Sequence, residues 1–211
     1  MLKILYTIIV CYAAVLAFLY FYQRNMLYFP TPLTAEQISN HDPYTSLGVQ
    51  SKDGLILRSW QADGDKDKKT FVFFHGNAGN AADRIPMMKI LMQAGHPIVL
   101  AEYRGYGNNS GSPSEEALIS DAHLLIDKLK LGGLVEEDMI FMGRSLGTGV
   151  ATQLASLYNC AALILVSPYS SLTDVASGHY PYFPVTFLMK DKFNSAEIIK
   201  NVTAPILMFH G

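Results

Sequence analysis

Short apolar segments with the spacing of strands alternate along this chain with longer segments that have the spacing of helices. Strands are predicted at residues 70–74, 97–103, 139–142, 162–166 and 205–209, and helices at 81–94, 114–130 and 146–158. A hairpin is predicted over residues 45–62, and the Tyr-, Pro- and Ser-rich residues 167–202 are expected to be irregular. Strands separated by helices need crossover connections. The sequence therefore predicts an α/β fold with a mostly parallel sheet that is covered on both faces.

The composition limits the partners of this fold. The chain has 211 residues, about the length of one domain, and its formal net charge is −2. Because basic residues are not in surplus, we predict no nucleic-acid partner. The chain shows no metal-ligand spacing and no dinucleotide-binding glycine pattern after a strand, so we predict neither a metal nor a cofactor.

The N-terminus is apolar over the length of a membrane span. Residues 4–22 carry no charge and no proline, and about 20 such residues cross a bilayer as a helix. A cleaved signal peptide is the main alternative, but its apolar region is usually shorter and no small-x-small cleavage site follows here. We therefore predict a single-pass membrane anchor over residues 1–24, in contact with the lipid bilayer, and a linker over residues 25–44. Lys3 and the α-amino group precede the span and Arg24 follows it, which favours an N-terminus inside and a domain outside the cytoplasm.

The motif Gly143-Arg-Ser145-Leu-Gly147 lies between a predicted strand and a predicted helix. This is the pattern of a nucleophile elbow, in which a sharp turn exposes the serine hydroxyl at the end of the strand. The turn leaves little room for side chains at Gly143 and Gly147. The amide of Leu146, at the start of the helix, can donate to a developing oxyanion. The motif predicts Ser145 as the catalytic nucleophile.

A second glycine-rich turn, His75-Gly76-Asn77-Ala-Gly79, follows the strand at residues 70–74. A turn at a strand end can direct a backbone N–H into the same cavity, so we predict the Asn77 amide as the second oxyanion donor. Gly76 is expected to support this loop. His75 is expected to shape the turn by hydrogen bonding, and its alternative role is that of a catalytic base.

Several segments together are typical of one family. They are Gln23–Pro30, Phe74–Gly79, Tyr103–Gly107, Gly111–Ser114, Gly143–Gly147 and Ser167–Ser171. On these segments the chain resembles the membrane-anchored α/β-hydrolase-domain proteins, close to serine-aminopeptidase-like hydrolases. The resemblance implies an α/β-hydrolase fold over residues 45–211, with a lid-like insertion near residues 167–202. It also implies a serine hydrolase of ester, thioester or amide bonds that acts on a small acyl or peptide substrate.

The same resemblance implies a catalytic acid and then a histidine after the serine, beyond the strand at residues 205–209. Only His210 and Gly211 follow that strand here. We therefore expect the chain to lack the final strand and helix of the fold, together with the triad acid and histidine, and to be inactive as given. His210 is the candidate substitute base, whereas surface or lid positions explain Asp174 and Asp191. The strand at residues 205–209 is expected to have an exposed, unpaired edge.

Two further questions stay open at this point. The aromatic residues of the insertion either form an apolar lid over the site or pack against the sheet; they are Tyr169, Tyr180, Tyr182, Phe183 and Phe187. An anchored site under an apolar lid would favour lipophilic acyl substrates. The competing function is a noncatalytic remnant of a hydrolase or a membrane-tethered binding protein.

Overall fold

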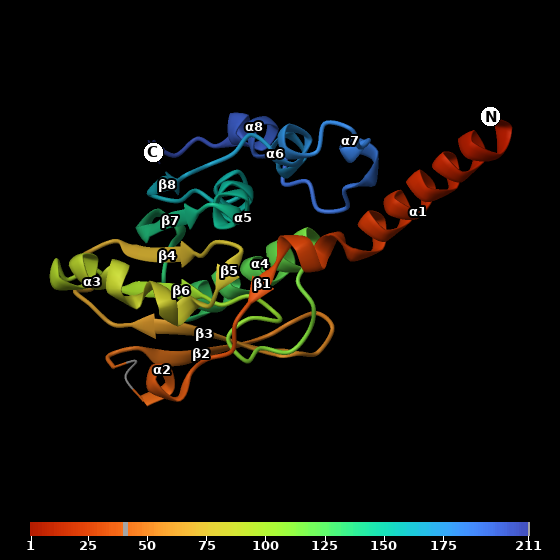
Figure 1. Cartoon of the computed structure of the whole chain (residues 1–211). Coiled ribbons are helices and arrows are strands. Elements are labelled where there is room, and N and C mark those ends of the chain that lie inside the picture. Colours follow the sequence, from red (N-terminus) through yellow and green to blue (C-terminus); the bar gives the residue numbers. More distant parts are fainter. Residues whose placement is uncertain (40–41, 211) are drawn as a thin grey trace.

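A central seven-stranded sheet organises the domain in the computed structural model, which describes residues 1–39 and 42–210. Its order is β2-β3-β6-β4-β7-β8-β9 (Figure 1). The strands are β2 (Thr45–Gln50), β3 (Ile56–Ala62), β4 (Thr70–Phe74), β6 (Ile98–Ala101), β7 (Met139–Arg144), β8 (Ala162–Val166) and β9 (Ile206–Phe209). β2 and β3 form the predicted hairpin, and β3 also pairs with β6 in antiparallel fashion. All the other neighbours are parallel, so the predicted mostly parallel sheet is confirmed.

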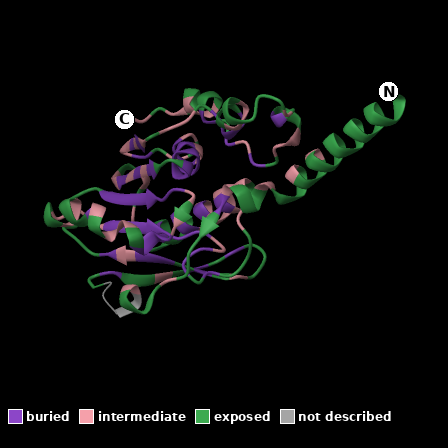
Figure 2. Ribbon diagram, viewed as in Figure 1, coloured by how far each residue is buried: buried purple, intermediate pink, exposed green. Residues whose placement is uncertain are grey.

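Helices cover both faces of this sheet. α3 (Ile85–Gln93) packs on one face, and α4 (Glu115–Leu131) and α5 (Leu146–Ala155) pack on the other. Every residue of β4 is buried, as expected for a central parallel strand. Its side chains alternate between the two faces, so that Phe73 and Phe74 belong to separate apolar clusters. Figure 2 shows this buried centre in purple.

Capping residues set where two of the predicted helices begin. The Ser114 hydroxyl accepts a hydrogen bond from the first turn of α4, which begins where the sequence predicts. The helix predicted over residues 81–94 begins instead with the 3₁₀ turn η1 (Ala81–Arg84). The reason is a capping box, in which the side chains of Asn80 and Asp83 each bond the other's backbone amide.

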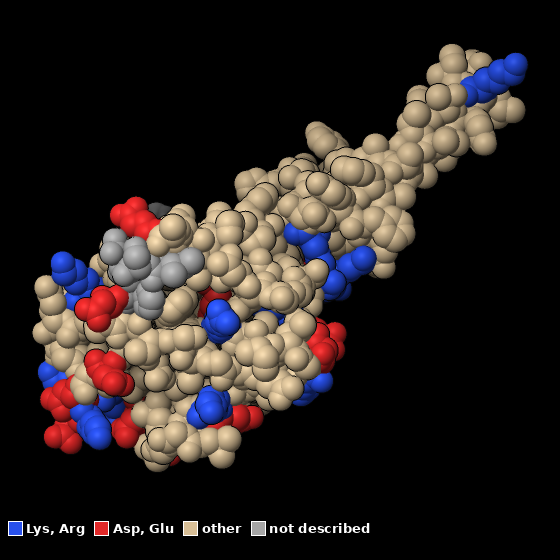
Figure 3. All heavy atoms as spheres, turned by 90° about the horizontal axis from the view of Figure 1, so that it is seen from below, with Lys and Arg blue, Asp and Glu red and all other residues tan. Residues whose placement is uncertain are grey.

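The N-terminal helix α1 (Leu2–Leu27) projects away from the domain (Figure 1). Its 26 residues give a length of about 39 Å at about 1.5 Å per residue. Within the described part of the chain it is the one helix long and apolar enough to cross a membrane. On the face shown in Figure 3, no charged side chain lies between the tip of α1 and its junction with the domain. The helix runs beyond the predicted span of residues 4–22 because neither proline nor glycine interrupts it before Pro30.

The chain that follows α1 is bonded to the domain. The short strand β1 (Phe29–Pro30) pairs in parallel with β5 (Ala78–Gly79), which lies directly after β4 and its loop. The helix α2 (Ala35–Ser39) follows. The Phe29 amide donates to the Asn77 carbonyl at 2.8 Å. The end of α1 is thereby tied to the loop that the sequence predicts as an oxyanion donor.

Residues 167–202, called the cap below, lie next to the inner half of α1 (Figure 1). The prediction that they are irregular is wrong in part. They contain the helices α6 (Leu172–His179), α7 (Val185–Leu188) and α8 (Ser195–Ile198) and the 3₁₀ turn η3 (Ile199–Asn201). The Ser171 hydroxyl accepts from the Asp174 amide at 2.9 Å and begins α6. This local capping signal was hidden by a composition that favours loops.

β9 lies at one side of the described sheet. It pairs with β8, and its exposed fractions range from 39% at Ile206 to 52% at Phe209. This is the exposed apolar strand that the sequence predicts. Aggregation through its free edge stays a prediction.

Candidate active site

The turn between β7 and α5 holds Ser145 in a strained conformation. Its φ is 49° and its ψ is −119°, a combination that residues other than glycine rarely adopt. The Ser145 amide donates to the Val166 carbonyl at 2.9 Å, and the Thr148 hydroxyl donates to the Ser145 carbonyl at 2.6 Å. These bonds hold the turn from both sides. The serine side chain is exposed at the carboxyl end of β7.

The two glycines of the motif allow this turn to pack. A Cβ atom added at Gly143 would lie 2.4 Å from the Gly147 carbonyl oxygen. One added at Gly147 would lie 2.1 Å from the Phe74 carbonyl oxygen. Both distances are far below van der Waals contact. The start of α5 therefore rests directly on the backbone at the end of β4, as the small residues predict.

The loop after β4 lies beside the serine. A Cβ atom added at Gly76 would lie 3.6 Å from the Ser145 Cβ. The Asn77 amide has no acceptor among the backbone hydrogen bonds of residues 1–39 and 42–210. The Leu146 amide lies in the first turn of α5, where amides have no partner within the helix. Two amides without an acceptor among the described residues thus lie near Ser145, one in the residue that follows it and one in the loop that its side chain approaches.

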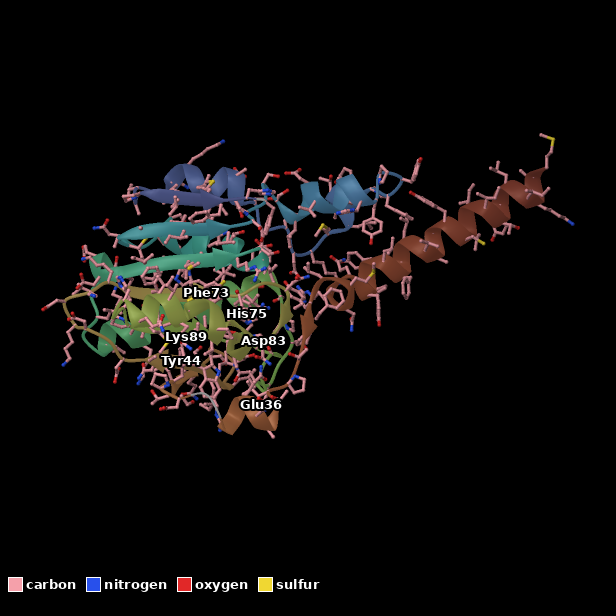
Figure 4. The ribbon with its side chains drawn as sticks, turned by 60° about the vertical axis from the view of Figure 1, so that its left-hand side comes forward. Glu36, Tyr44, Phe73, His75, Asp83 and Lys89 are labelled. Atoms are coloured by element: carbon pink, nitrogen blue, oxygen red, sulfur yellow. The ribbon has the colours of Figure 1, made fainter. Side chains whose placement is uncertain are left out.

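His75 is completely buried directly after β4 (Figure 4), and both of its ring nitrogens are occupied. Nδ1 lies 2.8 Å from the Gly76 carbonyl oxygen and Nε2 lies 3.1 Å from Glu102 Oε1. Because a carbonyl oxygen only accepts, Nδ1 carries a proton. The peptide unit is planar, so a fixed Gly76 carbonyl also fixes the direction of the Asn77 N–H. His75 therefore shapes the turn, and its geometry does not suit the alternative role of a catalytic base for Ser145.

Glu102 is a partner that the sequence reading missed. It is buried, and its second carboxylate oxygen accepts from the Ala81 amide at 3.0 Å. The carboxylate therefore joins His75 to the start of η1. Its signal in the sequence is a single acid directly after the apolar residues of β6. Buried carboxylates are rare unless they are paired, so an acid in that position indicates a partner.

Two tyrosines hold the carbonyls of the same loop. The Tyr103 hydroxyl donates to the His75 carbonyl at 2.9 Å, and the Tyr106 hydroxyl donates to the Asn77 carbonyl at 2.8 Å. Burial raises the pKa of both tyrosines well above the ordinary value, so both hydroxyls keep their protons. The segment Tyr103–Gly107 thus positions the loop, a role that the sequence motif alone did not assign.

The other histidines of the described chain are not hydrogen-bonded to Ser145. His123 Nδ1 lies 3.0 Å from the Tyr158 hydroxyl, and burial lowers the pKa of this half-buried side chain. His179 is exposed at the end of α6. His210 is exposed at the carboxyl end of β9, the edge of the sheet where the elbow lies. Within residues 1–39 and 42–210, no side chain bonds to the Ser145 hydroxyl.

The two acids considered from the sequence have different surroundings. Asp174 is exposed, and its carboxylate accepts from the Ser170 hydroxyl at 2.6 Å, as a surface position predicts. For Asp191 the lid position holds, because the residue lies in the cap, where it is buried. Its carboxylate accepts from Arg24 at 2.9 Å, from the Tyr28 hydroxyl at 3.1 Å and from the Glu115 amide at 3.1 Å. Asp191 therefore fastens the end of α1 to the cap and to α4.

The mostly parallel sheet, with a strained serine turn between a central strand and its following helix, defines an α/β hydrolase. The sequence model of the family described as serine aminopeptidase, S33, matches residues 65–186. The chain belongs to this family.

Relatives and solved structures agree with this assignment. An uncharacterized protein of Mycobacterium tuberculosis is 35% identical over 94% of this chain and 72% of its own length. The lysophosphatidylserine lipase ABHD12 of Macaca fascicularis is 32% identical over 77% of this chain and 45% of its own length. An α/β hydrolase of Vibrio vulnificus superimposes with a TM-score of 0.69 at 22% identity, over 81% of this chain and 64% of that chain. The predicted α/β-hydrolase fold is thus confirmed, and the function is that of an α/β hydrolase in general.

Proposed function

We propose that Ser145 is the nucleophile of a hydrolase that cleaves ester bonds of lipophilic acyl substrates. The observation that carries the proposal is the strained turn, which exposes the Ser145 hydroxyl near two amides that have no acceptor among residues 1–39 and 42–210. Ser145 Oγ attacks the carbonyl carbon and its proton passes to a base. The tetrahedral intermediate then expels the alcohol, which takes up that proton, and water releases the acid from the acyl-enzyme.

The amides of Asn77 and Leu146 stabilise the negative oxygen of the tetrahedral intermediate. Both belong to rigid backbone, because His75 fixes one and the start of α5 fixes the other. Fixed donors need no reorganisation as the charge develops, and loss of one such donor typically costs about 10²–10³ in turnover. The helix N-terminus adds a favourable dipole.

We further propose that Ser145 is not activated in the 211-residue chain, and that an acid and a histidine from elsewhere complete the triad. Support comes from the Ser145 hydroxyl, which has no hydrogen-bond partner among the described residues. Without its base the serine is a poor nucleophile, and turnover falls by about 10⁴–10⁶. The chain spans 72% of its relative from M. tuberculosis and 64% of the hydrolase from V. vulnificus.

A fluorophosphonate probe tests both parts of this proposal. The purified chain is treated in detergent micelles, with and without added imidazole as a substitute base. Ser145→Ala removes the proposed nucleophile. Ser167→Ala is the matched control, because Ser167 is also exposed, has a φ of 53° and follows the neighbouring strand.

We expect no labelling without imidazole and slow labelling with it, lost in Ser145→Ala and kept in Ser167→Ala. Labelling of Ser145 without imidazole would overturn the proposed lack of activation and leave the nucleophile in place. The absence of labelling under both conditions, in a chain whose fold is verified by circular dichroism, would favour the competing function of a noncatalytic or binding protein.

We also propose that α1 is a membrane anchor. A signal sequence passes the same test of length and composition, although its apolar region is usually shorter, and α1 makes specific contacts with the folded domain. Gln23 Nε2 donates to the Leu188 carbonyl at 3.0 Å, Gln23 Oε1 accepts from the Lys190 amide at 2.8 Å, and Arg24 pairs with Asp191. A removable segment needs no such contacts. N-terminal sequencing of the membrane fraction should find Met1 or Leu2, whereas a start beyond Tyr22 would show cleavage.

The domain is predicted to lie outside the cytoplasm. This prediction rests on the charges that flank the apolar part of α1, because Lys3 and the α-amino group precede it and only Arg24 follows it. Protease treatment of intact cells should then digest the domain. Protection from the protease would place it in the cytoplasm.

A further inference from the structure

A pocket of about 250 Å³ lies between the inner half of α1 and the cap. Its walls are mainly apolar; α1 supplies Leu19, Met26 and Leu27, and the cap supplies Val175, Leu188 and Met189. Gln23 also lines it, but both ends of the Gln23 amide already bond to backbone groups of the cap. His179 and Tyr180 are the other polar side chains in a lining that is otherwise apolar, so the pocket suits a hydrocarbon chain.

The inner end of the pocket lies next to the proposed oxyanion loop. Leu27 lines the pocket, and its carbonyl accepts from Asn77 Nδ2 at 3.0 Å. Ser145 itself does not line the pocket. The Leu27 wall of the pocket is thus hydrogen-bonded to the residue whose backbone amide is the proposed oxyanion donor.

The outer end lies beside the apolar part of α1. From Leu27 to Leu19 the pocket follows α1 for about 12 Å, at about 1.5 Å per residue. The cap continues outward beyond this point, because the Tyr12 hydroxyl donates to the Tyr182 carbonyl at 2.9 Å. The Tyr12 and Phe183 rings also stack with centroids 6.0 Å apart.

The cap surface at this outer end is aromatic and exposed. The exposed fractions of Tyr182 and Phe187 are 86% and 88%. Large exposed aromatic side chains beside an apolar helix are typical of a surface that contacts lipid. These two residues do not pack against the sheet, whereas Tyr169 packs against the core and donates to the Leu146 carbonyl at 3.1 Å, so neither alternative left open by the sequence holds for the whole group.

We infer that this pocket binds the acyl chain of a membrane lipid ester. The chain enters sideways from the bilayer between α1 and the cap, and α1 is one wall of the substrate site as well as an anchor. The inference rests on the proposed function only for the reaction at Ser145. Binding of the acyl chain requires the pocket alone.

Photocrosslinking tests the pocket directly. The whole chain is placed in phosphatidylcholine nanodiscs with a palmitic acid analogue that carries a diazirine near the end of its tail, and the crosslinked peptides are mapped by mass spectrometry. Ala176→Phe fills the pocket, because Ala176 lines it from α6. Ala196→Phe is the matched control, because Ala196 is exposed on α8 and does not line the pocket.

We expect crosslinks in peptides from residues 19–27 and 172–189. They should fall about tenfold in Ala176→Phe, because a filled, close-packed site has no room for a chain. They should persist in Ala196→Phe and in Ser145→Ala. Crosslinks spread evenly along α1 from residue 4 onward, and unchanged in Ala176→Phe, would overturn the inference and leave the imidazole-dependent labelling of Ser145 untouched. Pocket crosslinks without any labelling of Ser145 would instead contradict the proposed function alone.

Discussion

Replacement of Gly147 by alanine tests how closely the serine turn rests on the sheet. The added Cβ would lie 2.1 Å from the Phe74 carbonyl oxygen and 2.6 Å from the His75 carbonyl oxygen. Ordinary contact begins near 3.4 Å, so backbone must move by about 1.3 Å. Phe74 ends the buried central strand β4, which cannot shift alone. The clash therefore reaches the whole sheet.

The expected cost follows from two opposing effects. Overpacking of a close-packed interior costs about 1–3 kcal/mol, and a clash with backbone lies at the upper end. Alanine in place of glycine within a helix recovers up to about 1 kcal/mol. We expect Gly147→Ala to lower the free energy of unfolding by about 2 kcal/mol. With a urea m-value of about 2–3 kcal/mol per M, at the upper end of the usual range, the urea midpoint falls by roughly 0.7–1 M.

Gly178→Ala is the matched control. Gly178 is also helical, but a Cβ there meets nothing within 4 Å. Only the helix preference remains, so stability should rise by about 0.5 kcal/mol. Urea titration in micelles, followed by the fluorescence of Trp60, the single tryptophan, measures both variants. A Gly147→Ala midpoint at or above that of the parent chain would refute the proposed close packing of α5 on β4.

Three further predictions concern the groups around the site. Asp191→Asn should destabilise the packing of α1 against the cap by only about 1–2 kcal/mol, because Arg24 is 45% exposed and stays hydrated. Amide hydrogen exchange in the cap should then become faster, and unchanged exchange would contradict the role of Asp191 in holding α1 to the cap. Glu102→Ala should cost about 2–3 kcal/mol in urea unfolding, because the buried ring of His75 and the Ala81 amide each lose a hydrogen-bond partner; a neutral effect would exclude that pairing. Burial lowers the pKa of His123 in the folded chain below its ordinary 6.5. As the pH falls, His123 of the unfolded chain therefore binds a proton before His123 of the folded chain does. The stability that neutral His123 contributes is present above about pH 6.5 and is lost as the pH falls through the folded pKa. His123→Gln should therefore lose less stability than the parent chain between about pH 8 and pH 5, and equal losses would show that His123 makes no contribution.

Local patterns in the sequence were sufficient for the main strands and helices outside the cap and for the serine turn. The period of apolar residues predicted the parallel strands, and small residues around Ser145 predicted a sharp turn between β7 and α5. The apolar N-terminus predicted α1. These features depend on backbone preferences and on neighbours a few residues apart, which a sequence displays directly. Capping at Ser171 is also local, and closer attention to it would have predicted α6.

Only the tertiary structure decided which distant groups meet. Glu102 faces His75 because β6 and β4 are adjacent in the sheet, and Asp191 reaches Arg24 across 167 positions of the chain. The pocket has one wall from α1 and another from the cap, so neither segment shows it alone. Such contacts depend on how whole helices and strands pack against one another. Each polar group that this packing buries then needs a hydrogen-bond partner, and the spacing of residues in the sequence does not show which partner it finds. The sequence by itself determined a hydrolase-like turn and an apolar N-terminal helix, and only the packing of the cap against that helix formed the pocket between them.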